Sequence, residues 1–125
     1  MADVPVIAIV DDDEAVRASL SSLVRSLGYE VRTYESGDEF LREPGGDPAC
    51  LISDLQMPLM TGDELQATLV TAGRRFPIIF VTAFPTEPVR QRVMAAGAHG
   101  CLGKPCAEDE IIRCLEHALA GHKPQ

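Results

Sequence analysis

The sequence has no tryptophan, and aromatic residues of all kinds make up only 5% of its 125 positions. It has no run of lysine and arginine, and its net charge of -8 disfavours direct binding of nucleic acid or an anionic membrane. No apolar stretch approaches the length of a membrane span, and the N-terminus lacks the basic and apolar regions of a signal peptide. These absences predict a cytoplasmic domain that contacts neither membrane nor nucleic acid.

The four cysteines lack the paired spacing of a zinc site. They are Cys50, Cys101, Cys106 and Cys114. Because a cytosolic protein keeps its thiols reduced, we expect buried free thiols rather than disulfides or metal ligands.

What the sequence does contain is a regular alternation of strand-like and helix-like segments. An apolar share of 46% is typical of a folded domain of this length. Apolar or alternating runs predict five strands, at residues 4–10, 29–34, 51–54, 76–81 and 99–102. An amphipathic segment follows each strand and predicts a helix, and these helices end near Gly28, Leu41, Gly73, Gly97 and Gly121.

Capping residues support the predicted helix starts. Ser36 with Glu39, and Thr61 with Glu64, have the spacing of a capping box. Asp13 is the expected cap of the first helix. Strands and helices in strict alternation predict an α/β fold with right-handed crossovers. We expect a flavodoxin-like doubly wound (βα)5 sandwich, with a parallel five-stranded sheet in the order 2-1-3-4-5. The domain spans residues 1–121, and residues 122–125 form a tail.

Acidic residues fall where predicted strands end. Asp11 and Asp12 follow the first strand, and Asp54 ends the third. Thr82 follows the fourth strand, and Lys104 follows the fifth. In the order 2-1-3-4-5 the carboxyl ends of strands one, three and four are neighbours, so these side chains are expected to converge on one cleft.

The predicted cleft requires positive charge, because three carboxylates at close range repel one another in a partly buried site. Lys104 supplies one positive charge, and a divalent metal would supply two. Oxygen ligands with several waters favour Mg²⁺. Each residue also has an ordinary structural role, as a helix cap, a strand end or a solvated lysine. Four such coincidences at strand ends make that interpretation the weaker one.

Over nearly its whole length the chain resembles the receiver domain of response regulators in two-component signalling. Four pieces carry the resemblance: Asp11-Asp12, Asp54 with Met57-Pro58 and Gly62, Thr82-Ala83, and Lys104-Pro105. Each piece alone is a weak signal, but all four in this order are highly specific.

The resemblance implies that Asp54 accepts a phosphoryl group from a histidine kinase or a phosphotransfer protein. It also implies that Thr82 hydrogen-bonds the phosphoryl group and that Lys104 pairs with it. The chemistry is consistent, since a carboxylate can accept a phosphoryl group once the charges on both are neutralised. On this basis the domain is a phosphorylated switch whose only reactions are its own phosphotransfer and autodephosphorylation, and it is not otherwise an enzyme.

The resemblance also implies a ligand set for Mg²⁺. Asp12, Asp54 and the carbonyl group of Gln56 would bind the ion, and Asp11 would hold metal-bound water. The peptide bond between Lys104 and Pro105 is often cis in the family.

Two positions depart from the family pattern and affect the expected output. Receivers commonly carry an aromatic residue where this chain has Cys101, and a large residue where it has Cys106. We therefore expect Thr82, Phe84 and Cys101 to be the switch residues, with the movement centred on the segment 84–94 rather than on Cys101. The fourth and fifth helices would then offer a partner surface or a homodimer surface.

Three alternatives differ in class. The first is a receiver-like adaptor that acts without phosphorylation. The second is a flavodoxin-like cofactor binder, which would need a phosphate-cradling loop where this chain has the acidic run 11–14. The third is an aspartyl-phosphate hydrolase, whose second aspartate is replaced here by Gln56. A DNA-binding domain further along a longer protein is compatible with the sequence.

Overall fold

Five parallel strands form one sheet in the order β2-β1-β3-β4-β5. The computed structural model describes residues 4–43 and 46–121, so the expected tail 122–125 lies outside the described residues. The strands are β1 (Val6–Val10), β2 (Glu30–Tyr34), β3 (Cys50–Asp54), β4 (Ile78–Thr82) and β5 (Gly100–Gly103). This order confirms the flavodoxin-like sheet that the sequence predicts.

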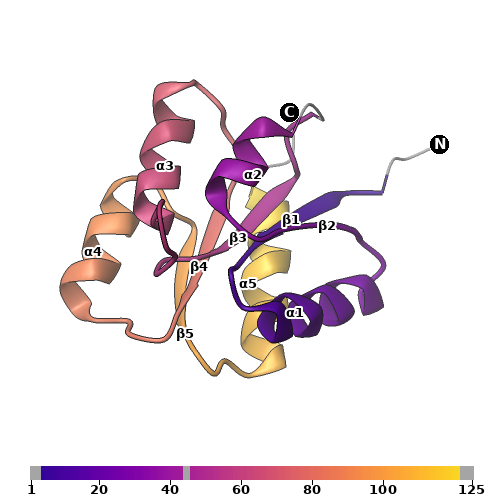
Figure 1. The fold of residues 1–125 in the computed structure, drawn as a ribbon. Coiled ribbons are helices and arrows are strands. Elements are labelled where there is room, and N and C mark those ends of the chain that lie inside the picture. The colour runs from indigo at the N-terminus through magenta and orange to yellow at the C-terminus, as the bar shows by residue number, and fades with distance from the viewer. Residues whose placement is uncertain (1–3, 44–45, 122–125) are drawn as a thin grey trace.

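Helices cover both faces of the sheet, so the domain has three layers (Figure 1). The helices are α1 (Glu14–Ser26), α2 (Gly37–Arg42), α3 (Gly62–Thr71), α4 (Glu87–Ala95) and α5 (Glu108–Gly121). On one face, α1 and α5 pack with residues such as Leu20 and Leu115; on the other, α2, α3 and α4 pack with residues such as Phe40 and Leu65. Burial on both faces explains why the central strands are continuously apolar.

The register of the strands brings the polar strand ends to one edge of the sheet. Val10 is paired with Ser53 across β1 and β3, and Asp54 is paired with Val81 across β3 and β4. The residues that directly follow β1 therefore lie beside the last residue of β3, which in turn lies beside the end of β4. This geometry positions the site described below.

The capping residues act largely as predicted. Asp13 caps α1 by accepting hydrogen bonds from the backbone N–H groups of Ala15 and Val16. Thr61 and Glu64 form the expected reciprocal capping box at the start of α3.

At α2 the predicted box is only half formed. Ser36 accepts from the N–H of Glu39, but the Glu39 carboxylate accepts from the N–H of Glu35 instead of that of Ser36. The Glu39 side chain thus reaches one residue further back along the chain than the motif implies.

Several predicted boundaries are wrong by one or two residues. β1 begins at Val6 rather than at Val4, and β5 covers 100–103 rather than 99–102. The backbone N–H of His99 still bonds to Ile78 at 2.8 Å, so pairing to β4 begins before the regular strand does. Within residues 4–43 and 46–121, no helix is long and apolar enough to cross a membrane.

Candidate functional site

Asp54 is the last residue of the central strand β3, so it lies at the carboxyl edge of the sheet. The residue is only 6% exposed. Its Oδ1 atom accepts a hydrogen bond from the backbone N–H of Gln56 at 3.3 Å, and its carbonyl oxygen accepts one from the Ser53 hydroxyl at 2.9 Å. The other carboxylate oxygen, Oδ2, faces Lys104 across 3.4 Å.

Close packing of α3 on the end of β3 holds Asp54 in place. A Cβ atom at Gly62 would lie 2.4 Å from the carbonyl oxygen of Asp54 and 2.9 Å from Cα of Leu55. The N–H of Gly62 donates to the Leu55 carbonyl at 2.8 Å. Only glycine fits at this position, because any larger residue would collide with the end of β3.

The loop between β3 and α3 has a feature that sequence reasoning missed. Leu59 has a positive φ of 71° and its side chain is fully exposed, beside the buried Met57. A non-glycine residue in the left-handed region is uncommon and is found preferentially at functional loops. Pro58 preceding it was the only signal in the sequence that the backbone turns sharply here.

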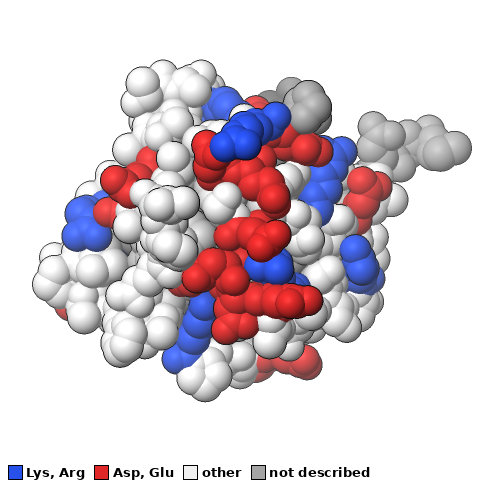
Figure 2. Space-filling model, viewed as in Figure 1, with Lys and Arg blue, Asp and Glu red and all other residues white. Residues whose placement is uncertain are grey.

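Asp54 and two other carboxylates form a cluster. One oxygen from each of Asp11, Asp12 and Asp54 lies within 4.8 Å of the others. Asp11 is almost wholly buried and Asp12 is exposed. Figure 2 shows acidic side chains gathered across the middle of the face in view, with basic side chains among them.

Lys104 provides the cation that the cluster requires. Its ammonium nitrogen lies 2.9 Å from Oδ2 of Asp11 and 3.4 Å from Oδ2 of Asp54. Its backbone N–H donates to the carbonyl of Thr82 at 2.7 Å, which ties the end of β5 to the end of β4. The bond to Pro105 is cis, as the family resemblance implies.

Burial and charge shift the pKa values of the two partners. Burial raises the pKa of the Asp54 carboxyl, and the charge of Asp11 adds to the rise, while Lys104 and the Gln56 N–H oppose it only partly. Burial opposes the charged form of Lys104, but its hydrogen bond to Asp11 and the charges of both aspartates outweigh this and raise its pKa. The lysine therefore remains a cation.

Thr82 is the last residue of β4, the strand next to that of Asp54, and Phe84 lies two residues further along the following loop. Thr82 is 1% exposed, and its Oγ1 atom accepts a hydrogen bond from the N–H of Phe84 at 3.3 Å. The Phe84 ring is 65% exposed. The hydroxyl group and the aromatic residue are thus coupled through the backbone in this structure.

Cys101 is buried beneath α4 at the position where the family usually has a ring. It is 5% exposed, and its carbonyl oxygen accepts a hydrogen bond from Nη1 of Arg90 at 3.1 Å. The structure therefore places two of the three predicted switch residues, Thr82 and Phe84, together, and the third on the neighbouring strand. Gln56 is exposed at the rim.

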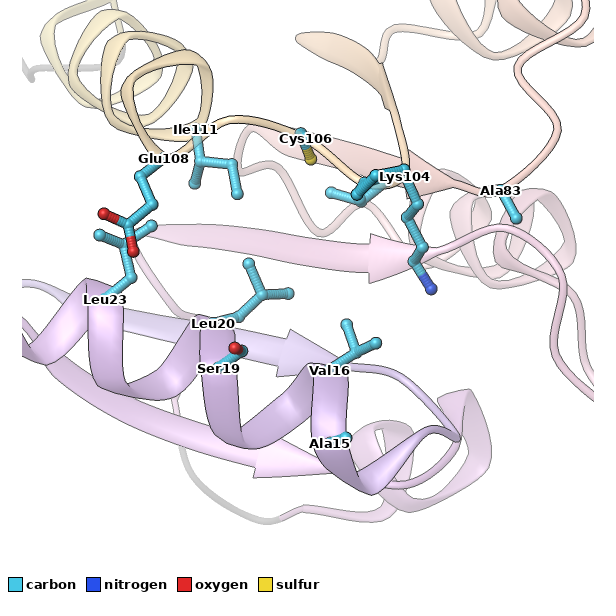
Figure 3. A pocket seen from close by; sticks show the side chains of 12 residues that line it. Ala15, Val16, Ser19, Leu20, Leu23, Ala83, Lys104, Cys106, Glu108 and Ile111 are labelled. Carbon is cyan, nitrogen blue, oxygen red and sulfur yellow. The ribbon is translucent and has the colours of Figure 1, made fainter.

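An open apolar cavity of about 620 Å³ lies next to the cluster, between α1 and α5, and the sequence did not predict it. Figure 3 shows Val16 and Leu20 of α1 on one side of it and Cys106 and Ile111 on the other, with Lys104 at one end. Lys104 therefore belongs both to the lining of the cavity and to the carboxylate cluster.

The donor set at the carboxylate cluster suits a hard divalent cation. All three side chains offer oxygen, and the exposed Asp12 leaves room for water. Oxygen ligands with retained waters are what Mg²⁺ prefers. A divalent charge would also offset the burial and the repulsion from Asp11 that together raise the pKa of Asp54.

Comparison with known proteins decides the family. The sequence model of the response regulator receiver domain matches residues 7–116. The chain belongs to this family. Receiver domains of this kind interact with kinases or phosphotransfer proteins in two-component systems. The expected family is confirmed, while the roles of the individual site residues stay predictions.

Curated relatives are longer than this receiver domain. It is 40% identical over 115 residues to response regulator protein TmoT of Ectopseudomonas mendocina, covering 91% of this chain and 52% of TmoT. It is 33% identical over 119 residues to transcriptional regulatory protein FixJ of Bradyrhizobium diazoefficiens, covering 94% of this chain and 58% of FixJ. The chain thus spans about half the length of the curated relatives that it matches.

Solved structures show the same fold. The structure of FixJ-N superposes with a TM-score of 0.87 at 33% identity, covering 100% of this chain and 99% of that one. Response regulator StyR superposes with a TM-score of 0.85 at 39% identity, covering 94% of this chain and 60% of that one.

Proposed function

We propose that this receiver domain accepts a phosphoryl group on Asp54 from a phosphohistidine of a histidine kinase or phosphotransfer protein, and switches conformation in response. The observation that carries the proposal is the difference between the two buried aspartates. Both oxygens of Asp11 are engaged, Oδ1 by the N–H of Asp13 and Oδ2 by Lys104 at 2.9 Å. Asp54 keeps Oδ2 at the longer distance of 3.4 Å from Lys104. Asp54 therefore has the freer nucleophilic oxygen.

In the proposed transfer step, Asp54 is the attacking group and the imidazole of the donor is the leaving group. An oxygen of Asp54 attacks the phosphorus atom, the phosphorus–nitrogen bond of the donor breaks, and the donor imidazole leaves with the electron pair of that bond. Lys104 stabilises the negative charge on the phosphoryl oxygens. Mg²⁺, held by Asp12, Asp54 and the Gln56 carbonyl with Asp11 holding metal-bound water, would supply two further positive charges.

Thr82 connects the modified carboxylate to the rest of the domain. Its hydroxyl group accepts from the Phe84 N–H and can at the same time donate to a phosphoryl oxygen. Drawing the hydroxyl toward the phosphoryl group would pull the backbone at Phe84 and the helix α4 that follows. The switch therefore acts through the loop between β4 and α4.

The cavity between α1 and α5 is the proposed docking site of a helix from the phosphohistidine donor. It is lined mostly by apolar side chains and adjoins Lys104, so a helix seated there would bring its histidine toward Asp54. Ser19→Arg places a charge in the cavity, whereas Ser22→Arg on the same helix lies outside it. Ser19→Arg is expected to slow transfer from the kinase at least tenfold and leave labelling by acetyl phosphate unchanged. Equal rates of transfer to Ser19→Arg and Ser22→Arg would refute the proposal that the donor helix docks in this cavity.

The acceptor itself is tested by labelling. Wild-type protein with acetyl phosphate and Mg²⁺ should gain one phosphoryl group, and Asp54→Asn should gain none. Asp11→Asn serves as the comparison, because its labelling would be slowed but would still map to Asp54. Undiminished labelling of Asp54→Asn at another residue would refute the assignment.

The remaining expectations concern the whole protein. Transcriptional output is proposed because relatives such as FixJ are named as transcriptional regulators, and this chain covers only 58% of FixJ. The receiver itself carries a net charge of -8, so DNA binding would belong to another domain. A homodimer through the surface of α4 and α5 is the proposed form of the activated state. We assign no enzymatic activity beyond autophosphotransfer and autodephosphorylation.

A phosphorylation-independent adaptor is the second candidate, and the burial of Cys101 in place of a ring favours it. An adaptor would bind its partner equally well as wild type and as Asp54→Asn. Partner binding that requires Asp54 excludes it.

A further inference from the structure

Two histidines far apart in sequence meet on the side of the domain formed by β5 and α5. His99 directly precedes β5, and His117 lies on α5. The Nδ1 atom of His117 is 3.0 Å from the Nε2 atom of His99, and the ring centroids are 5.0 Å apart with the planes inclined at 42°. His117 is exposed and His99 is half-buried, so solvent and ions reach the pair.

The packing of α5 on β5 holds these two rings together. A Cβ atom at Gly100 would lie 2.7 Å from Sγ of Cys114, so the helix approaches the strand as closely as a glycine allows. His117 is three residues beyond Cys114 and therefore projects from the same side of the helix. The backbone N–H of His99 donates to the Ile78 carbonyl at 2.8 Å, which fixes the backbone that carries the His99 ring.

The separation of the two nitrogens fits a hydrogen bond between the rings, and it also fits two ligands on one metal ion. Imidazole nitrogens bind zinc at about 2.0–2.1 Å, so two of them at bond angles between 90° and the tetrahedral value lie roughly 2.9–3.4 Å apart. The observed 3.0 Å falls within that range. Neutral imidazole is a preferred ligand of Zn²⁺, Ni²⁺ and Cu²⁺.

We propose that His99 and His117 form a binding site for a divalent transition-metal ion of this class, separate from the carboxylate cluster. The two sites differ in chemistry and in place. The histidine pair offers nitrogen and lies at the start of β5, whereas the cluster offers oxygen and lies beyond the end of that strand, near Lys104. Mg²⁺ therefore belongs to the cluster and not to the histidine pair.

The site would be exchangeable and would not hold the fold together by itself. Among residues 4–43 and 46–121, the carboxylate cluster is the only group of three or more His, Cys, Asp and Glu side chains gathered closely enough for one ion. The histidine pair thus supplies two ligands, and water completes the coordination. Structural zinc sites, in contrast, have four protein ligands.

Metal binding at the pair would clamp α5 to β5 and stabilise the folded chain. The two nitrogens lie 18 residues apart in sequence and are brought together only by folding. A metal at ten times its dissociation constant multiplies the folding equilibrium constant by about eleven, if it binds only the folded state. The clamp would act on α5, which is one of the two helices of the proposed α4 and α5 dimer surface.

The test is a titration of the 125-residue chain with Ni²⁺ and with Zn²⁺, in an excess of Mg²⁺ that occupies the carboxylate cluster, followed by thermal unfolding and by the NMR signals of the histidine rings. We expect saturable binding of one ion within a few equivalents, a higher melting temperature, and perturbed ring signals of both His99 and His117. His99→Gln and His117→Gln should each abolish these effects. Cys114→Ser and Asp54→Asn should retain the binding and the higher melting temperature. His122→Gln should retain them too, and His122 lies outside the described residues.

Each other outcome overturns the proposal. Binding that survives in His99→Gln and His117→Gln but is lost in Asp54→Asn places the ion in the carboxylate cluster. Loss in Cys114→Ser or His122→Gln with retention in His99→Gln assigns the ion to other ligands. The absence of saturable binding in the wild type means that the pair is only a hydrogen bond between two imidazoles.

Discussion

The ammonium nitrogen of Lys104 lies 2.9 Å from Oδ2 of Asp11, a residue 93 positions earlier in the chain. This contact joins the residues that follow β5 and β1, two strands separated in the sheet by β3 and β4. Because Lys104 approaches Asp11 more closely than Asp54, it neutralises the Asp54 carboxylate only in part. The raised pKa of Asp54 follows from that geometry and from burial.

Replacing Asp54 by asparagine should stabilise the metal-free protein at neutral pH, on the order of 1 kcal/mol. Its folded-state pKa is raised above the ordinary value of 3.8, so the free energy of unfolding falls as pH rises from 3.8 through the raised value. At neutral pH the full cost of the buried charge is present, and asparagine removes it. Below pH 3.8 the two proteins should have equal stability. Urea unfolding with EDTA at both pH values measures the difference.

The same pair of proteins tests the metal site. Mg²⁺ should raise the melting temperature of the wild type, because it binds the folded cluster and not the unfolded chain. Asp54→Asn and Asp12→Ala should lose most of this rise. A wild-type melting temperature that is indifferent to millimolar Mg²⁺ would argue against the cluster as the Mg²⁺ site.

Much of the fold was predictable because local signals are strong in this chain. Apolar runs bounded by glycine and proline marked the strands, and Thr61 and Asp13 marked helix starts through hydrogen bonds that span three residues or fewer. The strand order and the convergence of the acidic residues needed the general rules of parallel α/β sheets, and the match to the receiver family made both specific.

Other features depend on contacts that no local pattern encodes. His99 and His117 meet across 18 residues, and the side chain of Gln66 donates to the Val93 carbonyl across 27 residues. The cavity between α1 and α5 depends on how two helices pack, which periodicity does not define. Leu59 adopts a positive φ that its residue type does not predict.

Gly62→Ala should destabilise the domain by about 1–3 kcal/mol, the usual cost of an added methyl group in a filled space. The new Cβ would lie 2.4 Å from the Asp54 carbonyl oxygen, so the backbone of β3 or α3 must shift. Labelling by acetyl phosphate should also slow, since the shift displaces Asp54. Gly46→Ala is the matched control, because nothing lies within 4 Å of its Cβ position. Equal stability of both variants would show that the β3–α3 junction relaxes freely.

The thiols should react in an order set by burial. Burial raises the pKa of Cys50 from 9.0 to about 12, with a contribution from Cys114, so the native protein holds Cys50 as an inert thiol. Cys106 lines the open cavity and is partly exposed, so iodoacetamide should modify it first. In Cys106→Ser the fast phase should disappear, and Cys50 should react only when the protein unfolds. Rapid native labelling of Cys50, mapped by mass spectrometry, would contradict the buried position.

Activation should move α4 and leave the strand β5 largely unchanged. Cys101 is too small to fill the space beneath α4 that a ring would occupy, so it cannot carry the movement as an aromatic residue does. The Thr82 hydroxyl is instead bonded to the N–H of Phe84, two residues along the chain. With beryllofluoride and Mg²⁺, amide shifts and hydrogen exchange should change over residues 84–94 and change little over 100–102. The reverse distribution would refute this route.

Arg90 offers a way to test the route without phosphorylation. Its hydrogen bond to the Cys101 carbonyl ties α4 to the edge strand, and a bond of this kind contributes about 1 kcal/mol, or roughly a fivefold change in a local opening equilibrium. Arg90→Gln should therefore increase hydrogen exchange in α4 by about that factor and shift its amide signals toward the beryllofluoride-bound positions. Gln91→Ala, on the exposed side of the same helix, is the control. Loss of a hydrogen bond that restrains α4 must increase hydrogen exchange in that helix. If the Arg90→Gln and Gln91→Ala proteins exchange at the same rate, Arg90 therefore does not hold α4 in its resting position.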